Sequence, residues 1–137
     1  MEKVDLEKIL PHRKPMLLVD EAYVNENGNA TGRYTVQGDE FFLQGHFPGN
    51  PVVPGVILCE MMAQTCAVLL SVKSEGKTPY FTSLEKVHFK QVVKPGDTVE
   101  FHCEIVKSKP PFYFAKGSGS VSGILSIEGE FSFALLG

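Results

Sequence analysis

A histidine and a glutamate enclose a short stretch rich in proline and glycine near the middle of the chain. Residues 46–60 read HFPGNPVVPGVILCE, so His46 opens this stretch and Glu60 closes it. Imidazole changes its charge near neutral pH, which suits it to take up a proton. A carboxyl group among apolar side chains has a raised pKa, which makes it a usable acid. Because an acid and a base in different environments are typical of proton-transfer catalysis, we predict catalytic roles for both residues.

The surroundings of the two residues strengthen this prediction. Pro48, Gly49 and Pro51 restrict the loop that carries His46, and a group fixed before the reaction lowers the entropic part of the barrier. Glu60 lies within an apolar run, where an unpaired charge costs several kcal/mol, so it must pair, be neutralised or react. The alternatives are a surface histidine and a glutamate at an exposed helix edge.

Gly55 is the third candidate, because it falls in the first turn of a predicted helix. Backbone N–H groups there have no partner within the helix and favour negative charge. They can stabilise the enolate that forms when a carbon beside a carbonyl loses its proton. Gly55 can also simply allow close packing, and both roles are compatible. Glu60 lies ~7 Å further along the helix axis, so either the loop folds back or a second subunit supplies His46 or Glu60.

The other chemically active side chains fit structural roles better. We interpret His12 as a structural or surface residue, and His88 and His102 lie in strand patterns without a ligand partner at useful spacing. Cys59 and Cys66 share one helix face and are most simply core residues.

A loose basic set offers a second kind of function. Lys86, Lys90 and Lys94 lie close together in the sequence. They are either solvated surface or a docking surface for an acidic partner.

Composition limits the class of protein. The chain has 137 residues, 43% of them hydrophobic and 21% charged, and a net charge of −3. We therefore expect residues 1–137 to form a single globular domain, and the acidic balance argues against nucleic acid as a partner. Three cysteines without a CxxC pattern predict neither a disulfide framework nor a zinc site, and free thiols suit the cytoplasm. The N-terminus shows no signal peptide.

Residues 52–72 are largely apolar and need a separate test as a membrane span. Pro54, Gly55, Glu60 and Gln64 interrupt the apolar run, and a spanning helix needs ~20 predominantly apolar residues. We interpret the segment as the buried helix of a protein without a membrane partner.

The remaining pattern predicts an α+β fold. We expect a short helix at 5–10, a turn at 25–29, a loop at 41–54, a long helix from Pro54 and Gly55 to about 74, and strands at 16–24, 30–36, 80–89, 98–107, 112–121 and 124–135. The long helix is apolar nearly all round, so an antiparallel sheet of about six strands must wrap around it. The open sheet edges suggest pairing with another copy of the chain.

Four segments resemble one enzyme family. Residues 10–20 (LPHRKPMLLVD), 45–56 (GHFPGNPVVPGV), 60–64 (EMMAQ) and 89–97 (FKQVVKPGD) are similar to the FabZ-type 3-hydroxyacyl-[acyl-carrier-protein] dehydratases. Val53 stands where methionine is common in this family, and Lys90 and Gln91 stand where two arginines are common. The second departure weakens any transfer of docking residues for the carrier protein.

The resemblance implies a hot-dog fold and the elimination of water from a (3R)-hydroxyacyl thioester, giving the trans-2-enoyl thioester of fatty acid biosynthesis. His46 would take the α-proton, Glu60 would assist departure of the hydroxyl, and the backbone at Gly55 and Val56 would hold the thioester carbonyl. The family pattern implies no cofactor, an acyl carrier protein as partner, and homodimers that often form hexamers with shared sites. Glu60 favours a plain dehydratase, since isomerising relatives typically carry aspartate there.

Two alternatives remain from the same residues. An isomerase or hydratase of a related thioester needs the same α-proton exchange, whereas a thioesterase needs a placed water rather than this loop. A protein of another class, a non-catalytic acyl-carrier-binding subunit, would not need His46 and Glu60.

Overall fold

The computed structural model describes residues 2–10, 12–44, 49, 51–70 and 77–136. The strands are β1 (Glu2–Lys3), β2 (Glu21–Val24), β3 (Ala30–Thr35), β4 (Thr78–Phe89), β5 (Thr98–Lys109), β6 (Phe112–Val121) and β7 (Ile124–Leu136). The helices are α1 (Leu6–Ile9) and α2 (Gly55–Ala67), with short 3₁₀ helices η1 (Phe41–Leu43) and η2 (Val68–Leu70).

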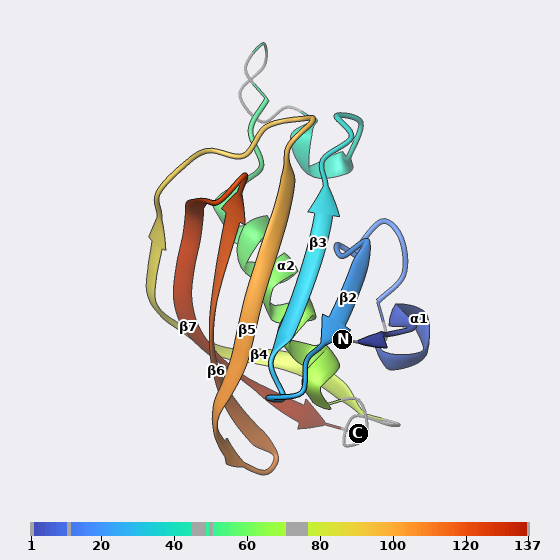
Figure 1. Cartoon of the computed structure of the whole chain (residues 1–137), viewed down its shortest axis with the longest axis vertical. Coiled ribbons are helices and arrows are strands. Elements are labelled where there is room, and N and C mark those ends of the chain that lie inside the picture. Colours follow the sequence, from blue (N-terminus) through green and yellow to red (C-terminus); the bar gives the residue numbers. More distant parts are fainter. Residues whose placement is uncertain (1, 11, 45–48, 50, 71–76, 137) are drawn as a thin grey trace.

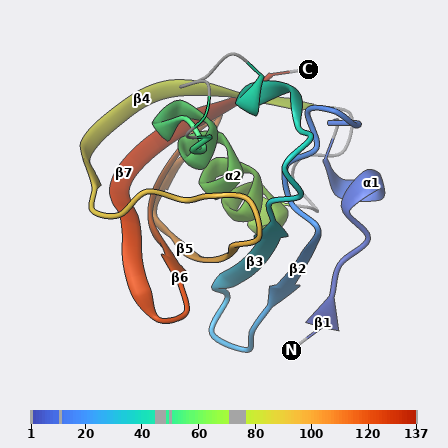
Figure 2. The ribbon, with the colours of Figure 1, turned by 90° about the horizontal axis from the view of Figure 1, so that it is seen from above.

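One antiparallel sheet wraps around α2. Its strand order is β1-β2-β3-β5-β6-β7-β4, so β1 and β4 are the two edges. Figures 1 and 2 show the sheet curling around the central helix, which packs chiefly on β3, β5 and β6. The predicted α+β hot-dog fold is confirmed, and the very short β1 adds a seventh strand to the expected six.

The long strands are confirmed close to their predicted bounds because turn residues mark their ends. β6 and β7 are joined at Ser122 and Gly123, whose φ angles of 52° and 81° give the left-handed conformation that a two-residue hairpin turn requires. The turn between β2 and β3 is also as predicted, with Gly28 at φ 78°.

Two predicted elements are too long. The strand expected at 16–24 is limited to β2, because the N–H groups of Met16 and Leu17 bond the carbonyl of Arg13 in a turn. The helix expected to reach about residue 74 ends at Ala67 and continues as η2 to Leu70, while residues 71–76 lie outside the described part. An uninterrupted apolar pattern does not mark this change to 3₁₀ geometry. No helix in the described part is long and apolar enough to cross a membrane.

The core lies between α2 and the inner face of the sheet. Met61 and Met62 on α2 and Phe101 and Ile127 on the sheet have no exposed surface. The helix approaches the sheet so closely at Gly117 that a Cβ there would lie 2.9 Å from Met62 Cγ. This close approach sets the position of α2 on the sheet. It therefore also determines which residues of α2 face away from the sheet.

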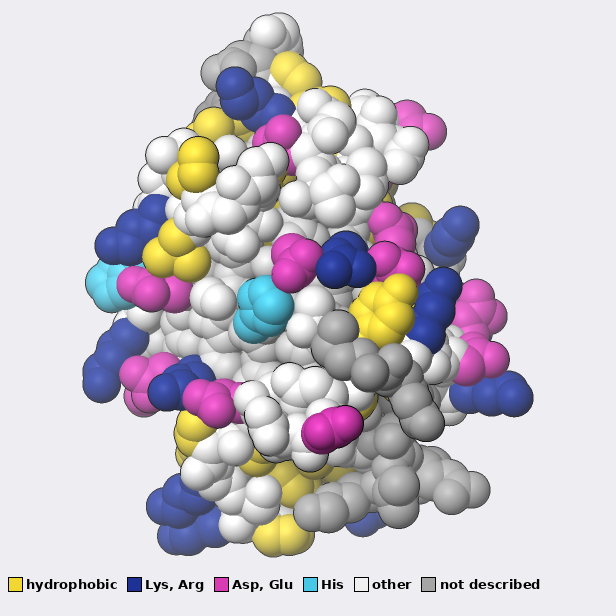
Figure 3. Space-filling model, in the orientation of Figure 1, with side chains coloured by type: hydrophobic (Ala, Val, Ile, Leu, Met, Phe, Trp, Pro, Cys, Tyr) yellow, Lys and Arg dark blue, Asp and Glu magenta, His cyan; other side chains and the backbone are white. Residues whose placement is uncertain are grey.

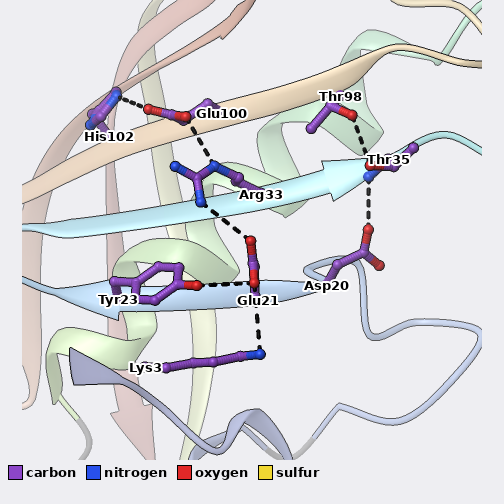
Figure 4. Close-up of polar contacts among 9 residues, drawn as sticks. All are labelled: Lys3, Asp20, Glu21, Tyr23, Arg33, Thr35, Thr98, Glu100 and His102. Atoms are coloured by element: carbon purple, nitrogen blue, oxygen red, sulfur yellow. Dashed lines mark hydrogen bonds and ion pairs between the residues drawn. The ribbon is translucent and has the colours of Figure 1, made fainter. Parts of the chain in front are cut away.

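The outer face of the sheet is polar (Figure 3). Arg33 on β3 bridges Glu100 on β5, at 3.0 Å, and Glu21 on β2, at 3.2 Å (Figure 4). Lys3 and His102 extend this network at its two ends. Such exposed ion pairs contribute little to stability individually, so we interpret the network as the water-facing surface of the sheet.

Candidate active site

Glu60 lies in the second turn of α2 and has two polar neighbours. Gln64 Nε2 donates a hydrogen bond to Glu60 Oε2 at 2.9 Å, and His12 Nε2 lies 3.4 Å from the same oxygen. The Glu60 side chain is 24% exposed. It is therefore less enclosed in this single chain than the apolar sequence around it suggested, and the carboxyl group is paired rather than isolated.

Gln64 connects Glu60 to the segment that precedes β2. Its side chain is 1% exposed and forms three hydrogen bonds. The oxygen accepts from the N–H of Leu18 at 2.8 Å, and Nε2 donates both to the carbonyl of Met16, at 2.9 Å, and to Glu60. A buried amide with its partners in place is held in one orientation, so Gln64 fixes one side of the Glu60 carboxyl group.

His12 reaches Glu60 because Arg13 holds the backbone around it. The Arg13 guanidinium donates to the carbonyls of Glu7, Leu10 and His12 at 2.8 to 2.9 Å. Sequence analysis interpreted His12 as a surface or structural residue and did not connect it to Glu60. Pro11 and Pro15 in the sequence indicated that the backbone near His12 is constrained. Nothing in the sequence indicated that His12 would contact α2.

An apolar pocket of about 230 Å³ opens beside Glu60. It is lined by His12, Glu60, Ala63, Gln64, Ala67, Pro79, Tyr80, Phe81 and Phe133. The polar groups lie together, and the other walls are aliphatic and aromatic, which suits an acyl chain whose reacting end faces the carboxyl group. Two larger hollows, of about 670 and 1260 Å³, lie on the outer sheet face and beside α1. We place the site at the smaller pocket, because neither larger hollow contains Glu60.

The first turn of α2 leaves backbone N–H groups without partners within the helix. Pro54 precedes the helix, and the N–H of Val53 bonds the carbonyl of Val93 at 2.8 Å, which anchors the chain just before it. The N–H groups of Gly55 and Val56 have no helical carbonyl before them to accept their bonds. Gly55 also serves close packing, since a Cβ there would lie 2.7 Å from Cε1 of Phe89.

His46 and residues 45, 47 and 48 lie outside the described residues. The pairing of His46 with Glu60, and the sharing of the site between two subunits, therefore stay predictions.

Cys59 and Cys66 are core residues, as their spacing predicted, and Cys103 is buried as well. Cys59, Cys66 and Cys103 are buried and free. Burial raises the pKa of Cys66 to about 12 and holds the pKa of Cys103 well above its usual value. Buried thiols with raised pKa values are poor nucleophiles, which agrees with a structural role for Cys66 and Cys103.

The remaining histidines and the basic set lie away from the pocket. His102 is on the outer face, 3.0 Å from Glu100, and His88 borders the hollow on that face. Lys86 lies 3.5 Å from Glu130, whereas Lys90 and Lys94 have no ion-pair partner within the described part of the chain.

A sheet wrapped around a helix that presents a carboxyl group to an apolar pocket defines a hot-dog fold with a candidate acyl-thioester site. A protein-family model described as ApeI-like, ApeI dehydratase, matches residues 22–124. The chain is 43% identical over 136 residues to 3-hydroxyacyl-[acyl-carrier-protein] dehydratase FabZ of Clostridium beijerinckii, covering 96% of each protein. It is 47% identical over 131 residues to the FabZ of Caldicellulosiruptor saccharolyticus, covering 93% of this chain and 94% of that one. The chain therefore belongs to the FabZ family of 3-hydroxyacyl-[acyl-carrier-protein] dehydratases.

Solved structures agree on the fold. The dehydratase heterocomplex ApeI:P of Xenorhabdus doucetiae aligns with a TM-score of 0.84 at 19% identity, over 98% of this chain and 92% of that one. The PaaI protein of E. coli aligns with a TM-score of 0.63 at 14% identity, over 82% and 80%. Identities this low support the shared architecture alone.

Proposed function

We propose that residues 1–137 form a single dehydratase domain that converts (3R)-hydroxyacyl-[acyl-carrier-protein] to trans-2-enoyl-[acyl-carrier-protein] in fatty acid biosynthesis, in the cytoplasm. The observation that carries this proposal is the position of Glu60, a family-motif residue whose carboxyl group is held by Gln64 at the polar end of an apolar pocket. No cofactor enters the proposed chemistry.

The reaction uses one base and one acid. The imidazole of His46 removes the proton from C2, and the electron pair of that C–H bond moves toward the thioester oxygen. The N–H groups of Gly55 and Val56 stabilise the resulting enolate. The enolate then collapses to form the C2=C3 bond, the C3–O bond breaks, and the hydroxyl leaves as water with a proton from Glu60. Proton transfer through solvent from the His46 imidazolium to the Glu60 carboxylate restores the enzyme.

The active assembly in this proposal is a homodimer, with a hexamer formed as a trimer of dimers. Support comes from β4, an edge strand that exposes Tyr80, Phe81, Leu84 and Phe89. An edge strand with exposed apolar side chains favours pairing with a second copy. Such pairing would also cover the pocket, because Tyr80 and Phe81 line it.

The substrate arrives on an acyl carrier protein, which is the partner named for the relatives. Lys90 and Lys94 support this part of the proposal. The backbone of Val93 bonds Val53 just before α2, so Lys94 follows a residue whose backbone lies beside the chain that leads into this helix.

A direct assay tests the proposed function. Purified protein is incubated with a 3-hydroxyacyl thioester, and formation of the enoyl product is followed by its ultraviolet absorbance. Chromatography of the products separates the trans-2-enoyl thioester from the 3-enoyl isomer that an isomerase would form. Absence of any enoyl product with a carrier-bound substrate would contradict the enzymatic assignment and favour a non-catalytic acyl-carrier-binding subunit.

A further inference from the structure

Both polar neighbours of Glu60 meet the same carboxyl oxygen. Gln64 Nε2 lies 2.9 Å from Oε2, and His12 Nε2 lies 3.4 Å from Oε2. Oε1 has no hydrogen-bond or ion-pair partner among the residues that the structure describes. The amide nitrogen of Gln64 can only donate, so Oε2 must act as an acceptor. The two oxygens of one carboxyl group are therefore in different environments.

The other ring nitrogen of His12 indicates which tautomer faces Glu60. His12 Nδ1 is buried and has no hydrogen-bond partner within the described residues. A proton on Nδ1 would leave a buried donor unsatisfied and would turn the lone pair of Nε2 toward the carboxyl oxygen. A proton on Nε2 replaces the lone-pair repulsion by a favourable contact, because Nε2–H then points at an acceptor, although the buried Nδ1 remains an acceptor without a partner in the described part of the chain. The neutral imidazole is thus expected to donate to Glu60.

We propose that His12 is a positioning residue, which together with Gln64 holds Oε2 of Glu60 so that the transferred proton resides on Oε1. This inference rests on the proposed acid role of Glu60. The distance of 3.4 Å is longer than that of a well-formed hydrogen bond, and catalytic contacts in free enzymes commonly shorten when substrate binds. As Glu60 releases its proton, the two donors stabilise the carboxylate that remains.

The backbone around His12 is built to keep this geometry. Arg13 ties the chain to the carbonyls of Glu7 and Leu10, and Gln64 ties it to α2 through Met16 and Leu18. The backbone is thus anchored on both sides of His12. An anchored backbone limits the movement by which the His12 side chain would close its contact with Glu60.

Substitutions of His12 test the proposal through kinetics. His12→Phe keeps a ring but removes the donor, and we expect kcat to fall by ~10–100-fold, the loss of one hydrogen bond to a charged group, with KM nearly unchanged. His12→Gln restores an N–H donor and should recover most of kcat, whereas His12→Met, of similar length but without a donor, should not. This pair keeps the test valid if the phenylalanine variant does not fold. The matched control is His102→Phe on the outer sheet face, which should have wild-type kcat.

A double variant separates positioning from a general structural effect. If His12 acts through Glu60, adding His12→Phe to Glu60→Gln should cause no further loss of kcat. A further tenfold loss, or equal activities of the glutamine and methionine variants at position 12, would overturn the proposal. Full activity of Glu60→Gln alone would instead refute the proposed function, so the two failures can be told apart.

Discussion

Gln64 and Glu60 lie one helical turn apart on α2, with the Gln64 amide 2.9 Å from Glu60 Oε2. The same amide satisfies two backbone groups of the segment before β2, the N–H of Leu18 and the carbonyl of Met16. One buried side chain therefore supports both the acid of the site and the attachment of the N-terminal region to the central helix.

Gln64→Met should destabilise the protein. The substitution leaves the buried N–H of Leu18 and the carbonyl of Met16 without their partners, and each unsatisfied group costs roughly 1–3 kcal/mol. Urea unfolding should show a clearly lower free energy of unfolding, whereas the control Gln91→Met at an exposed position should stay close to wild type. An unchanged unfolding midpoint for Gln64→Met would mean that these hydrogen bonds contribute nothing.

His46→Ala and Glu60→Gln should each abolish most dehydration while leaving the fold intact. A general acid or base contributes typically ~10²–10⁴-fold to the rate, and each substitution removes one of the two. Steady-state turnover of a 3-hydroxyacyl thioester measures the loss, and far-ultraviolet circular dichroism checks the fold. Near wild-type turnover in either variant would exclude that residue as the acid or base.

Mixing these two inactive variants should restore activity if each site takes His46 from one subunit and Glu60 from the other. After random exchange half of the dimers are hybrids, and each hybrid has one intact site of two, so roughly a quarter of wild-type turnover should return. The measurement follows turnover after reversible dissociation of the mixed subunits. No recovery after subunit exchange is confirmed by mass spectrometry would place both groups in one chain.

The strands were predictable because local signals define them. Pro110 and Pro111 precede β6, and Ser122 and Gly123 follow it, so its predicted bounds agree with the structure. The segment at 16–20 carries the same apolar pattern as a strand, but Leu18 bonds the Gln64 side chain instead of a neighbouring strand. An apolar sequence pattern indicates that a segment is buried, but it does not identify the group that its backbone will bond.

The candidate site was predictable only in part, because local sequence does not identify contacts between distant segments. Glu60 stands out in the sequence because a carboxyl group conflicts with an apolar helix, and Gly55 stands out because glycine is unusual at a helix start. The contact between His12 and Glu60 was not predicted, because it joins segments far apart in the chain. The position of His12 depends on Arg13 and on how the N-terminal segment packs against α2, and neither can be derived from spacing.

Glu40 should make stability depend on pH at the acidic end. Burial opposes its charged form, but hydrogen bonds from the N–H groups of Gln37 and Gly38 and from the Tyr34 hydroxyl outweigh this, so the pKa of Glu40 is lowered. The unfolded chain then binds the proton more readily, and stability is lost as pH falls from the ordinary glutamate pKa through the lowered one. Glu40→Gln should unfold more easily than wild type at neutral pH, and the difference should shrink in acid. Thermal unfolding from pH 3 to 7 measures it, and a constant difference would contradict the assignment.

The charge reversal Lys90→Glu with Lys94→Glu should weaken use of a carrier-bound substrate. Complementary charge mainly raises the rate of encounter with an acidic partner, and salt screens the effect. We expect KM for the carrier-bound substrate to rise several-fold at low salt, with a smaller rise at high salt. A small thioester mimic, which carries no acidic protein, should be converted as before. Lys109→Glu, near the β5–β6 hairpin at the opposite end of the molecule, is the matched control (Figure 1). Equal losses on both substrates would show that Lys90 and Lys94 support the fold or the pocket instead of docking.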